Sequence, residues 1–117
     1  MLTKKEKYLT IIEHYGMHNQ LKKINEEFFE FCEAVYEADF TLENVGHVEE
    51  ELADIFVLLE QFIAYYDLNL EKVSEIMKCK VERQLKRIQK ESFMKKFFKE
   101  KFFRIKVWIL WNTEIKS

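Results

Sequence analysis

Proline is absent from the 117-residue sequence, and glycine occurs only at Gly16 and Gly46. So few turn and breaker residues do not suit a β-sandwich, and a content of 34% charged and 48% hydrophobic residues excludes a disordered or collagen-like chain. The composition therefore predicts an all-α fold. The length corresponds to one domain, and a helical chain of this size has apolar faces that a partner chain would help to bury.

Cysteine and long apolar runs are scarce as well. Cys32 and Cys79 have no metal-ligand partners nearby in the sequence, so we expect reduced thiols in a cytoplasmic protein. No apolar run follows the opening MLTKKEKYL, and no stretch approaches the roughly 20 apolar residues that span a bilayer. We expect neither secretion nor stable membrane insertion.

The net charge of −2 is unevenly distributed along the chain. Residues 1–92 carry 12 basic and 19 acidic residues, whereas residues 93–117 carry 7 basic and 2 acidic ones. The two parts are electrostatically different objects. We therefore divide the sequence into a helical domain, residues 1–92, and a basic, aromatic C-terminal extension, residues 93–117.

Apolar residues recur at steps of three and four along most of the chain, which predicts four helices joined by short connections. The first runs from about Thr3 to Tyr15 and ends at Gly16, a residue suited to a left-handed C-terminal position. The second has an apolar arc centred near Phe28 and Val35. Short connections between amphipathic helices favour antiparallel neighbours, hence a four-helix bundle. The second predicted helix covers residues 18–39. The third begins at about residue 45, after capping residues at 41–44, and the fourth runs from residue 70 to about 90.

Two pairs of acidic residues three positions apart lie on the second and third predicted helices. They are Glu27 with Glu30 and Glu51 with Asp54. Residues three apart share a helix face, so each pair can act as a two-pronged oxygen ligand. Glu51 falls inside the apolar sector of its helix, where an ionised carboxylate needs a proton, a salt bridge or a cation. The alternative is that these acids simply decorate solvated helix surfaces.

A set of four carboxylates favours a hard divalent cation, Mg²⁺ or Mn²⁺. The sequence offers no His/Cys constellation for zinc. A di-iron centre of the ferritin-like type requires Glu-x-x-His on two helices, and neither acidic pair has such a histidine. The acids therefore predict a magnesium site.

The fourth predicted helix has a polar column within its apolar face. Lys80, Gln84 and Arg87 follow one another at steps of four and three in KVERQLKR. Salt bridges to a neighbouring helix would account for such a column. Binding the oxygens of a polyphosphate is the functional alternative, because Lys and Arg are the usual donors to phosphate.

These motifs together resemble the MazG-like superfamily of all-α nucleoside triphosphate pyrophosphohydrolases. The resemblance rests on ExxE followed after 20 residues by ExxD, on the stretches QLKKINEEFFEF and EEELADIFVLLEQF, and on the later basic column. It covers roughly residues 16–90. Gln84 departs from the family pattern, which usually has Asn at this position.

The resemblance implies a helical bundle that assembles as a homodimer or homotetramer and hydrolyses a nucleotide between its α- and β-phosphates. It implies that Glu27, Glu30, Glu51 and Asp54 hold Mg²⁺. Glu26 or Glu27 would orient or deprotonate the attacking water, and Glu26 could instead be a solvated surface acid. The expected phosphate contacts are Lys80, Gln84 and Arg87, and the secondary substrate contacts are Gln20 and Lys23, with a local hydrogen bond as the alternative for Gln20.

The C-terminal extension interleaves Phe pairs with Lys and ends in an apolar run from Ile105 to Trp111. A prolongation of the fourth helix that packs on a neighbouring subunit is the leading interpretation. Interfacial membrane attachment, contact with nucleic acid, which we consider unlikely, and a non-native continuation are the others. A non-catalytic helical scaffold that binds a partner through this extension is the alternative to an enzyme.

Overall fold

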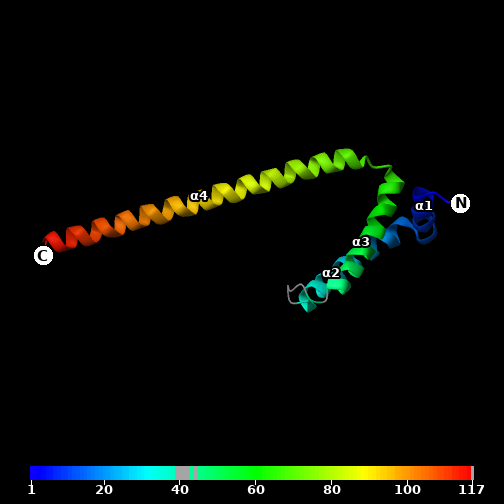
Figure 1. Ribbon diagram of the computed structural model, residues 1–117, viewed down its shortest axis with the longest axis horizontal. Coiled ribbons are helices and arrows are strands. Elements are labelled where there is room, and N and C mark those ends of the chain that lie inside the picture. The colour runs from blue at the N-terminus through cyan, green and yellow to red at the C-terminus, as the bar shows by residue number, and fades with distance from the viewer. Residues whose placement is uncertain (39–42, 44, 117) are drawn as a thin grey trace. The chain divides into compact units, whose positions relative to one another are not determined.

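The computed structural model describes residues 1–38, 43 and 45–116, with the side chains of residues 1–38, 43 and 45–113. It contains four helices, α1 (Lys4–Tyr15), α2 (Met17–Glu37), α3 (Val45–Tyr66) and α4 (Leu70–Lys116) (Figure 1). No strand occurs in the part of the chain that is described. The prediction of an all-α fold is confirmed, whereas the capping residues expected around Thr41 and Asn44 lie outside the described residues.

The chain divides into two compact units, Met1–Asn69 with α1, α2 and α3, and Leu70–Ser117 with α4. Helix α4 runs through the predicted division between residues 92 and 93 and extends to Lys116, beyond the end expected near Lys90. The predicted prolongation of the fourth helix into the extension is therefore present, whereas its packing on a neighbouring subunit stays a prediction. Packing among α1, α2 and α3 is shown, and a bundle of four helices stays a prediction.

Continuity of α4 follows from its sequence. Proline and glycine are absent from it, so no residue interrupts the hydrogen-bond ladder. Glu82, Glu91 and Glu100 each precede a Lys or Arg by four residues, an order that stabilises a helix by about 0.2–0.5 kcal/mol per pair. The change in charge after residue 92 therefore alters the helix surface without ending the helix.

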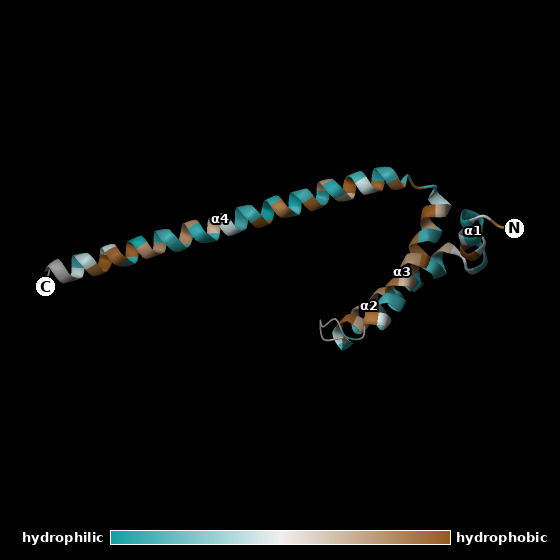
Figure 2. Cartoon of the chain, in the orientation of Figure 1, coloured by the Kyte–Doolittle hydropathy of each residue, from teal (hydrophilic) through white to brown (hydrophobic). Residues whose placement is uncertain are grey.

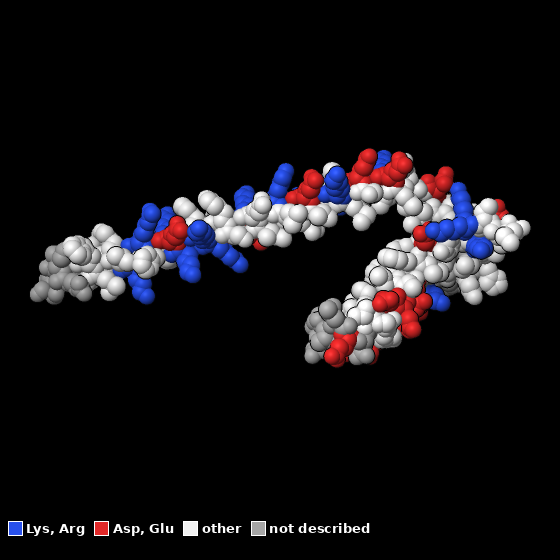
Figure 3. All heavy atoms as spheres, viewed as in Figure 1, with Lys and Arg blue, Asp and Glu red and all other residues white. Residues whose placement is uncertain are grey.

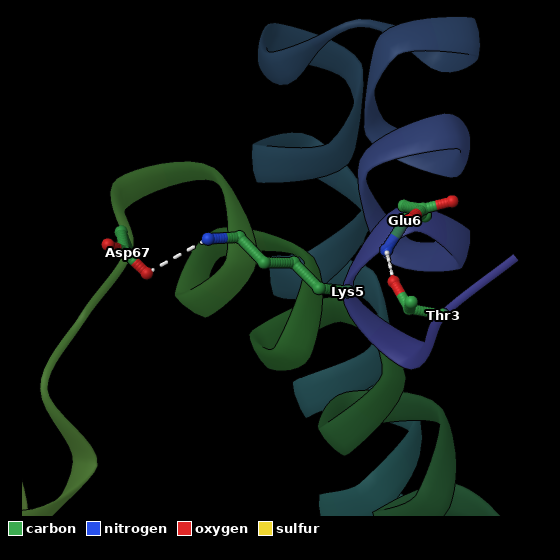
Figure 4. Close-up of polar contacts among 4 residues, drawn as sticks. All are labelled: Thr3, Lys5, Glu6 and Asp67. Atoms are coloured by element: carbon green, nitrogen blue, oxygen red, sulfur yellow. Dashed lines mark hydrogen bonds and ion pairs between the residues drawn. The ribbon is translucent and has the colours of Figure 1, made fainter.

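Specific groups fix both ends of α1. The Thr3 hydroxyl accepts a hydrogen bond of 3.2 Å from the backbone N–H of Glu6, which satisfies one of the free donors of the first turn (Figure 4). At the other end Gly16 has φ 87° and ψ 143°. The positive φ agrees with the sequence-based expectation, although ψ lies outside the left-handed helical region. This conformation turns the chain directly into α2.

The last turn of α3 ends in a Schellman motif. The backbone N–H of Asp67 donates to the carbonyl of Ala64, and that of Leu68 donates to the carbonyl of Ile63. Asp67 occupies the left-handed position, with φ 50°. Its carboxylate accepts a 2.9 Å hydrogen bond from the ammonium of Lys5, which links the start of α1 to the end of α3 (Figure 4).

The core of the first unit follows one stripe on each of α2 and α3. On α2 the least exposed positions recur at steps of three and four and include two half-buried residues, Ile24 and Phe31. This corrects the predicted centre of the apolar arc at Phe28, which is 46% exposed, whereas Val35 is half-buried like Ile24 and Phe31. The fully buried residues of the unit are Ile12, Gln20, Ala34, Ala38, Ile55, Leu58, Gln61 and Ala64.

Large apolar side chains remain exposed in the first unit. Phe28, Phe29 and Phe56 are between 46% and 65% exposed, and hydrophobic residues recur along α2 and α3 (Figure 2). The apolar sector of α3 is wider than the stripe that α1 and α2 cover. Both cysteines are also exposed, and neither forms a disulfide. Among the described residues, no helix is long and apolar enough to cross a membrane.

The two glycines provide a matched pair of substitutions. Gly16→Ala should lower the free energy of unfolding by about 1–3 kcal/mol, because an L side chain is strained at this backbone conformation. Gly46 lies in the first turn of α3, and an added Cβ there would meet nothing within 4 Å. Gly46→Ala should therefore leave stability unchanged or raise it by up to about 1 kcal/mol. Chemical denaturation measures both, and equal effects would contradict the assigned turn.

Candidate metal centre

Helices α2 and α3 bring three acidic side chains together. Carboxylate oxygens of Glu27, Glu51 and Asp54 all lie within 4.8 Å of one another. Glu51 and Asp54 are three residues apart on α3 and therefore share a face, and Glu27 lies on the buried stripe of α2, which packs against α3. The spacing of apolar residues predicted Glu51 inside an apolar sector, and Glu27 proves to occupy the corresponding place on α2.

The cluster is partly removed from water. Glu27 and Glu51 are half-buried, and Asp54 is exposed. One oxygen of each half-buried residue, Oε2, is inaccessible to solvent and has no hydrogen-bond partner among the residues that the structure describes. A buried carboxylate oxygen with no donor is unfavourable in its charged form, so the site needs protons or a cation.

The same surroundings change the acidity of both half-buried residues. Burial, which disfavours the charged form, is the largest cause of the raised pKa of Glu27, followed by the charges of Glu30 and Asp54. The pKa of Glu51 is also raised, first by burial and then by the same two neighbours. The neighbouring Glu30 side chain further raises both pKa values, because only a protonated carboxyl can donate a hydrogen bond to another carboxylate. The cluster is therefore a site that retains protons or attracts cations.

Glu30, the fourth predicted ligand, adjoins the cluster without belonging to the closest set. Its side chain is exposed, and its charge acts on both Glu27 and Glu51. The group within 4.8 Å contains only the other three acids. The structure thus gathers three predicted ligands tightly and places the fourth at their edge.

A histidine that the sequence did not single out lies beside the acids. Nε2 of His47 is 3.9 Å from Oε2 of Glu37, and its Nδ1 is 3.9 Å from Oε2 of Glu50. The charge of His47 lowers the pKa of Glu51, against the larger effects that raise it. Its position four residues before Glu51 on a predicted helix was the available signal.

A cavity of about 210 Å³ adjoins the carboxylates and is bounded by α1, α2 and α3. Gln20 and Lys23, the two secondary substrate candidates, both line it. So do Tyr15 and Gln61, which the sequence reasoning did not include. Its walls are Ile11, Tyr15, Gln20, Lys23, Glu27, Asp54, Val57, Leu58 and Gln61.

Two glutamine side chains join the helices at this cavity. Nε2 of Gln20 donates a 2.7 Å hydrogen bond to Oε1 of Gln61, and the two residues are 5% and 1% exposed. A local hydrogen bond was the alternative expected for Gln20. The bond that the structure shows joins it to a residue 41 positions away. Gln61 could have been noticed as a polar residue three positions after Leu58 on the same apolar face.

The remaining candidates lie elsewhere. Glu26 is exposed on α2, outside the close set of three acids. Lys80, Gln84 and Arg87 are exposed on α4, in the second unit, and their spacing places them along one side of that helix.

No family model, curated protein or solved structure matches the chain. The resemblance to the MazG-like superfamily therefore stays a prediction based on the motifs alone.

The raised pKa values predict how stability depends on pH and on Mg²⁺. At pH values between the ordinary and the raised pKa of Glu27 and Glu51, the folded protein binds more protons than the unfolded chain. The free energy of unfolding therefore falls as pH rises through this window. Mg²⁺ binds only the deprotonated carboxylates, so the increase in Tm that added Mg²⁺ produces should be larger at pH 8 than at pH 5. Thermal unfolding at both values, with and without Mg²⁺, measures this.

Glu51→Gln separates the two effects. At pH 8 this variant should raise the Tm of the metal-free protein, because it removes a charge from a site where charge is disfavoured, and it should abolish the increase that Mg²⁺ produces. Glu49→Gln, an exposed acid on the same helix, is the matched control and should retain that increase. A Glu51→Gln protein that Mg²⁺ stabilises as much as the wild type would contradict the assignment.

Proposed function

We propose that the protein is a Mg²⁺-dependent nucleotide pyrophosphohydrolase that converts a nucleoside triphosphate to its monophosphate and pyrophosphate. The observation that carries the proposal is the pair of solvent-inaccessible, unpartnered oxygens on Glu27 and Glu51, beside Asp54. A purely structural helix contact would be more stable with apolar or amide side chains in those places. The motif resemblance supplies the type of reaction.

The donor set fits the proposed ion. Three carboxylates within 4.8 Å, with Glu30 adjoining, form an all-oxygen site of the kind that Mg²⁺ and Mn²⁺ prefer over zinc. Glu27, Glu51 and Asp54 would hold the ion, with Glu30 completing the site. When bound, Mg²⁺ would neutralise phosphate charge and favour deprotonation of water.

Each remaining group would have a separate task in hydrolysis. Because Glu27 is occupied in holding the ion, Glu26 is the carboxylate available to accept a proton from the attacking water. Water would add to the α-phosphorus as the bond to the bridging oxygen breaks and pyrophosphate leaves. Lys80, Gln84 and Arg87 stay the phosphate contacts that the resemblance predicts, because Lys and Arg are the usual donors to phosphate.

The cavity beside the acids is too small to enclose a whole nucleotide. Its volume of about 210 Å³ is below the roughly 300–1,000 Å³ of pockets that enclose a whole small ligand. It would therefore take one end of a nucleotide and leave the rest outside. Lys23 and the buried Gln20 would contact that end.

Assembly is part of the proposal. The exposed Phe28, Phe29 and Phe56 leave apolar surface on the first unit that a second copy could cover. A homodimer or homotetramer is therefore expected, and sedimentation velocity would measure its mass. A monomer at all concentrations would contradict this part of the proposal without affecting the metal centre.

Activity is tested with a panel of ribo- and deoxyribonucleoside triphosphates and Mg²⁺, with pyrophosphate as the readout. Glu51→Gln and Asp54→Asn should each lower kcat/KM by about 100-fold or more, because each removes a metal ligand. Glu49→Gln should change it little. Folded protein that releases no pyrophosphate from any nucleotide would reject the enzymatic proposal in favour of a non-catalytic scaffold.

Two further variants separate the assigned roles. Glu26→Gln should lower kcat by about 10²- to 10⁴-fold while Mg²⁺ still raises the Tm, because this residue accepts a proton and does not hold the ion. Lys80→Ala and Arg87→Ala should mainly raise KM. Lys78→Ala, an exposed lysine two residues before Lys80, is the control for a general loss of positive charge.

A further inference from the structure

The distal part of α4, residues 93–113, is here named the basic aromatic segment. Five of its apolar residues recur at steps of four, four, three and four, which aligns these five along one side of the helix. All five are exposed, from 39% for Met94 to 70% for Phe102. This apolar side consists of Met94, Phe98, Phe102, Ile105 and Ile109.

Positive charge borders the apolar side. The segment carries six Lys or Arg residues and one acid, Glu100. At about 100° per residue, Lys95, Lys99 and Lys106 lie along one edge of the apolar side, and Lys101 lies along the other. Glu100 falls opposite the apolar side. Figure 3 shows the Lys and Arg side chains gathered along this part of α4.

Further aromatic residues lie outside the apolar side. Phe93 and Phe97 stack with ring centroids 6.5 Å apart, and Phe97 meets Phe98 edge to face at 5.9 Å. Trp108 lies at an edge of the apolar side and is 66% exposed. Trp and Phe between cations are the residues that settle at the boundary between lipid headgroups and acyl chains.

The charge pattern distinguishes among possible occupants of this surface. Two copies of the segment would each bring a net charge of +5, so pairing of the segment with itself is opposed by repulsion. Nucleic acid would satisfy the cations and stack on aromatic rings, but it would leave Met94, Ile105 and Ile109 uncovered. An anionic bilayer satisfies both features, because its headgroups meet the cations and its acyl region covers the apolar side.

We propose that the basic aromatic segment binds the surface of anionic lipid bilayers, lying in the plane of the interface with Met94, Phe98, Phe102, Ile105 and Ile109 toward the acyl chains. Lys95, Lys99, Lys101 and Lys106 extend from its edges to the headgroups. This function is independent of the metal centre, which lies in the first unit.

The chain contains an internal reporter for the test. Its two tryptophans are Trp108 and Trp111, both within the segment. Full-length protein is mixed with phosphatidylcholine vesicles containing 30% phosphatidylserine, and tryptophan emission and co-sedimentation are measured. Emission should shift to shorter wavelength and protein should sediment with the vesicles. Both responses should weaken as salt rises from 50 to 500 mM, and both should be much smaller with phosphatidylcholine alone.

Matched variants locate the binding surface. Replacing Lys95, Lys99 and Lys106 with Gln should weaken partitioning by about 100-fold, since each cation near such a surface contributes roughly fivefold. Replacing Lys78, Lys86 and Lys90 with Gln removes the same charge from the proximal part of α4 and should have little effect. Phe98→Gln with Ile105→Gln should abolish binding, whereas Phe103→Gln with Val107→Gln, on the other side of the helix, should weaken it less.

Circular dichroism of each variant confirms that α4 remains helical, so a loss of binding is not a loss of structure. Absence of an emission shift with anionic vesicles would overturn the proposal. An emission shift that appears without vesicles as protein concentration rises, and that added vesicles do not change, would also overturn it. In that case a second copy of the chain would cover the segment. Equal binding to anionic and uncharged vesicles would also overturn it.

Discussion

Two acids occupy places where α2 and α3 pack together, and they constrain both the stability and the chemistry of the first unit. Glu27 and Glu51 lie on the buried stripes of their helices, and each has an oxygen with neither water nor a hydrogen-bond partner. Apolar residues at both places would give a more stable contact between the helices. The acids are tolerated because protons, or a cation, can neutralise them. The stability of the first unit and its proposed chemistry are therefore set by the same carboxylates.

Much of the fold could be predicted because helix periodicity is a local property of the sequence. The bounds of α1, the positive φ of Gly16 and the half-buried position of Glu51 all follow from residues within a few turns of one another. The centre of the α2 stripe could not be fixed in this way. Phe28 and Val35 are the more apolar choice, but contact with α1 and α3 instead buries the line through Gln20 and Ala34. Which of two adjacent faces is covered depends on neighbouring helices.

In the candidate site, too, the features that depend on nearby residues could be predicted, and those that depend on contacts between helices could not. The close approach of Glu51 and Asp54 follows from a step of three residues, and Glu27 joins them through the packing of two neighbouring helices. Gln61 escaped notice because its partner, Gln20, lies on another helix. His47 approaches Glu37 on α2 as well as Glu50 on its own helix, and only the second of these could be inferred locally. The column of Lys80, Gln84 and Arg87 is regular on its own helix, but periodicity within one helix says nothing about its distance from acids on another.

Helix α4 is a long helix that contributes no buried side chains to a core over residues 70–111. Its side chains are exposed throughout residues 70–111, so propensity and charge order, rather than burial, account for its length. Its apolar residues contribute little to folding, because the unfolded chain exposes them as well. Their free energy of burial, about 1.5–3 kcal/mol for a large side chain, remains available for association. Selection of an occupant then rests on charge, which is +5 over the basic aromatic segment and +3 over residues 70–92 of the same helix.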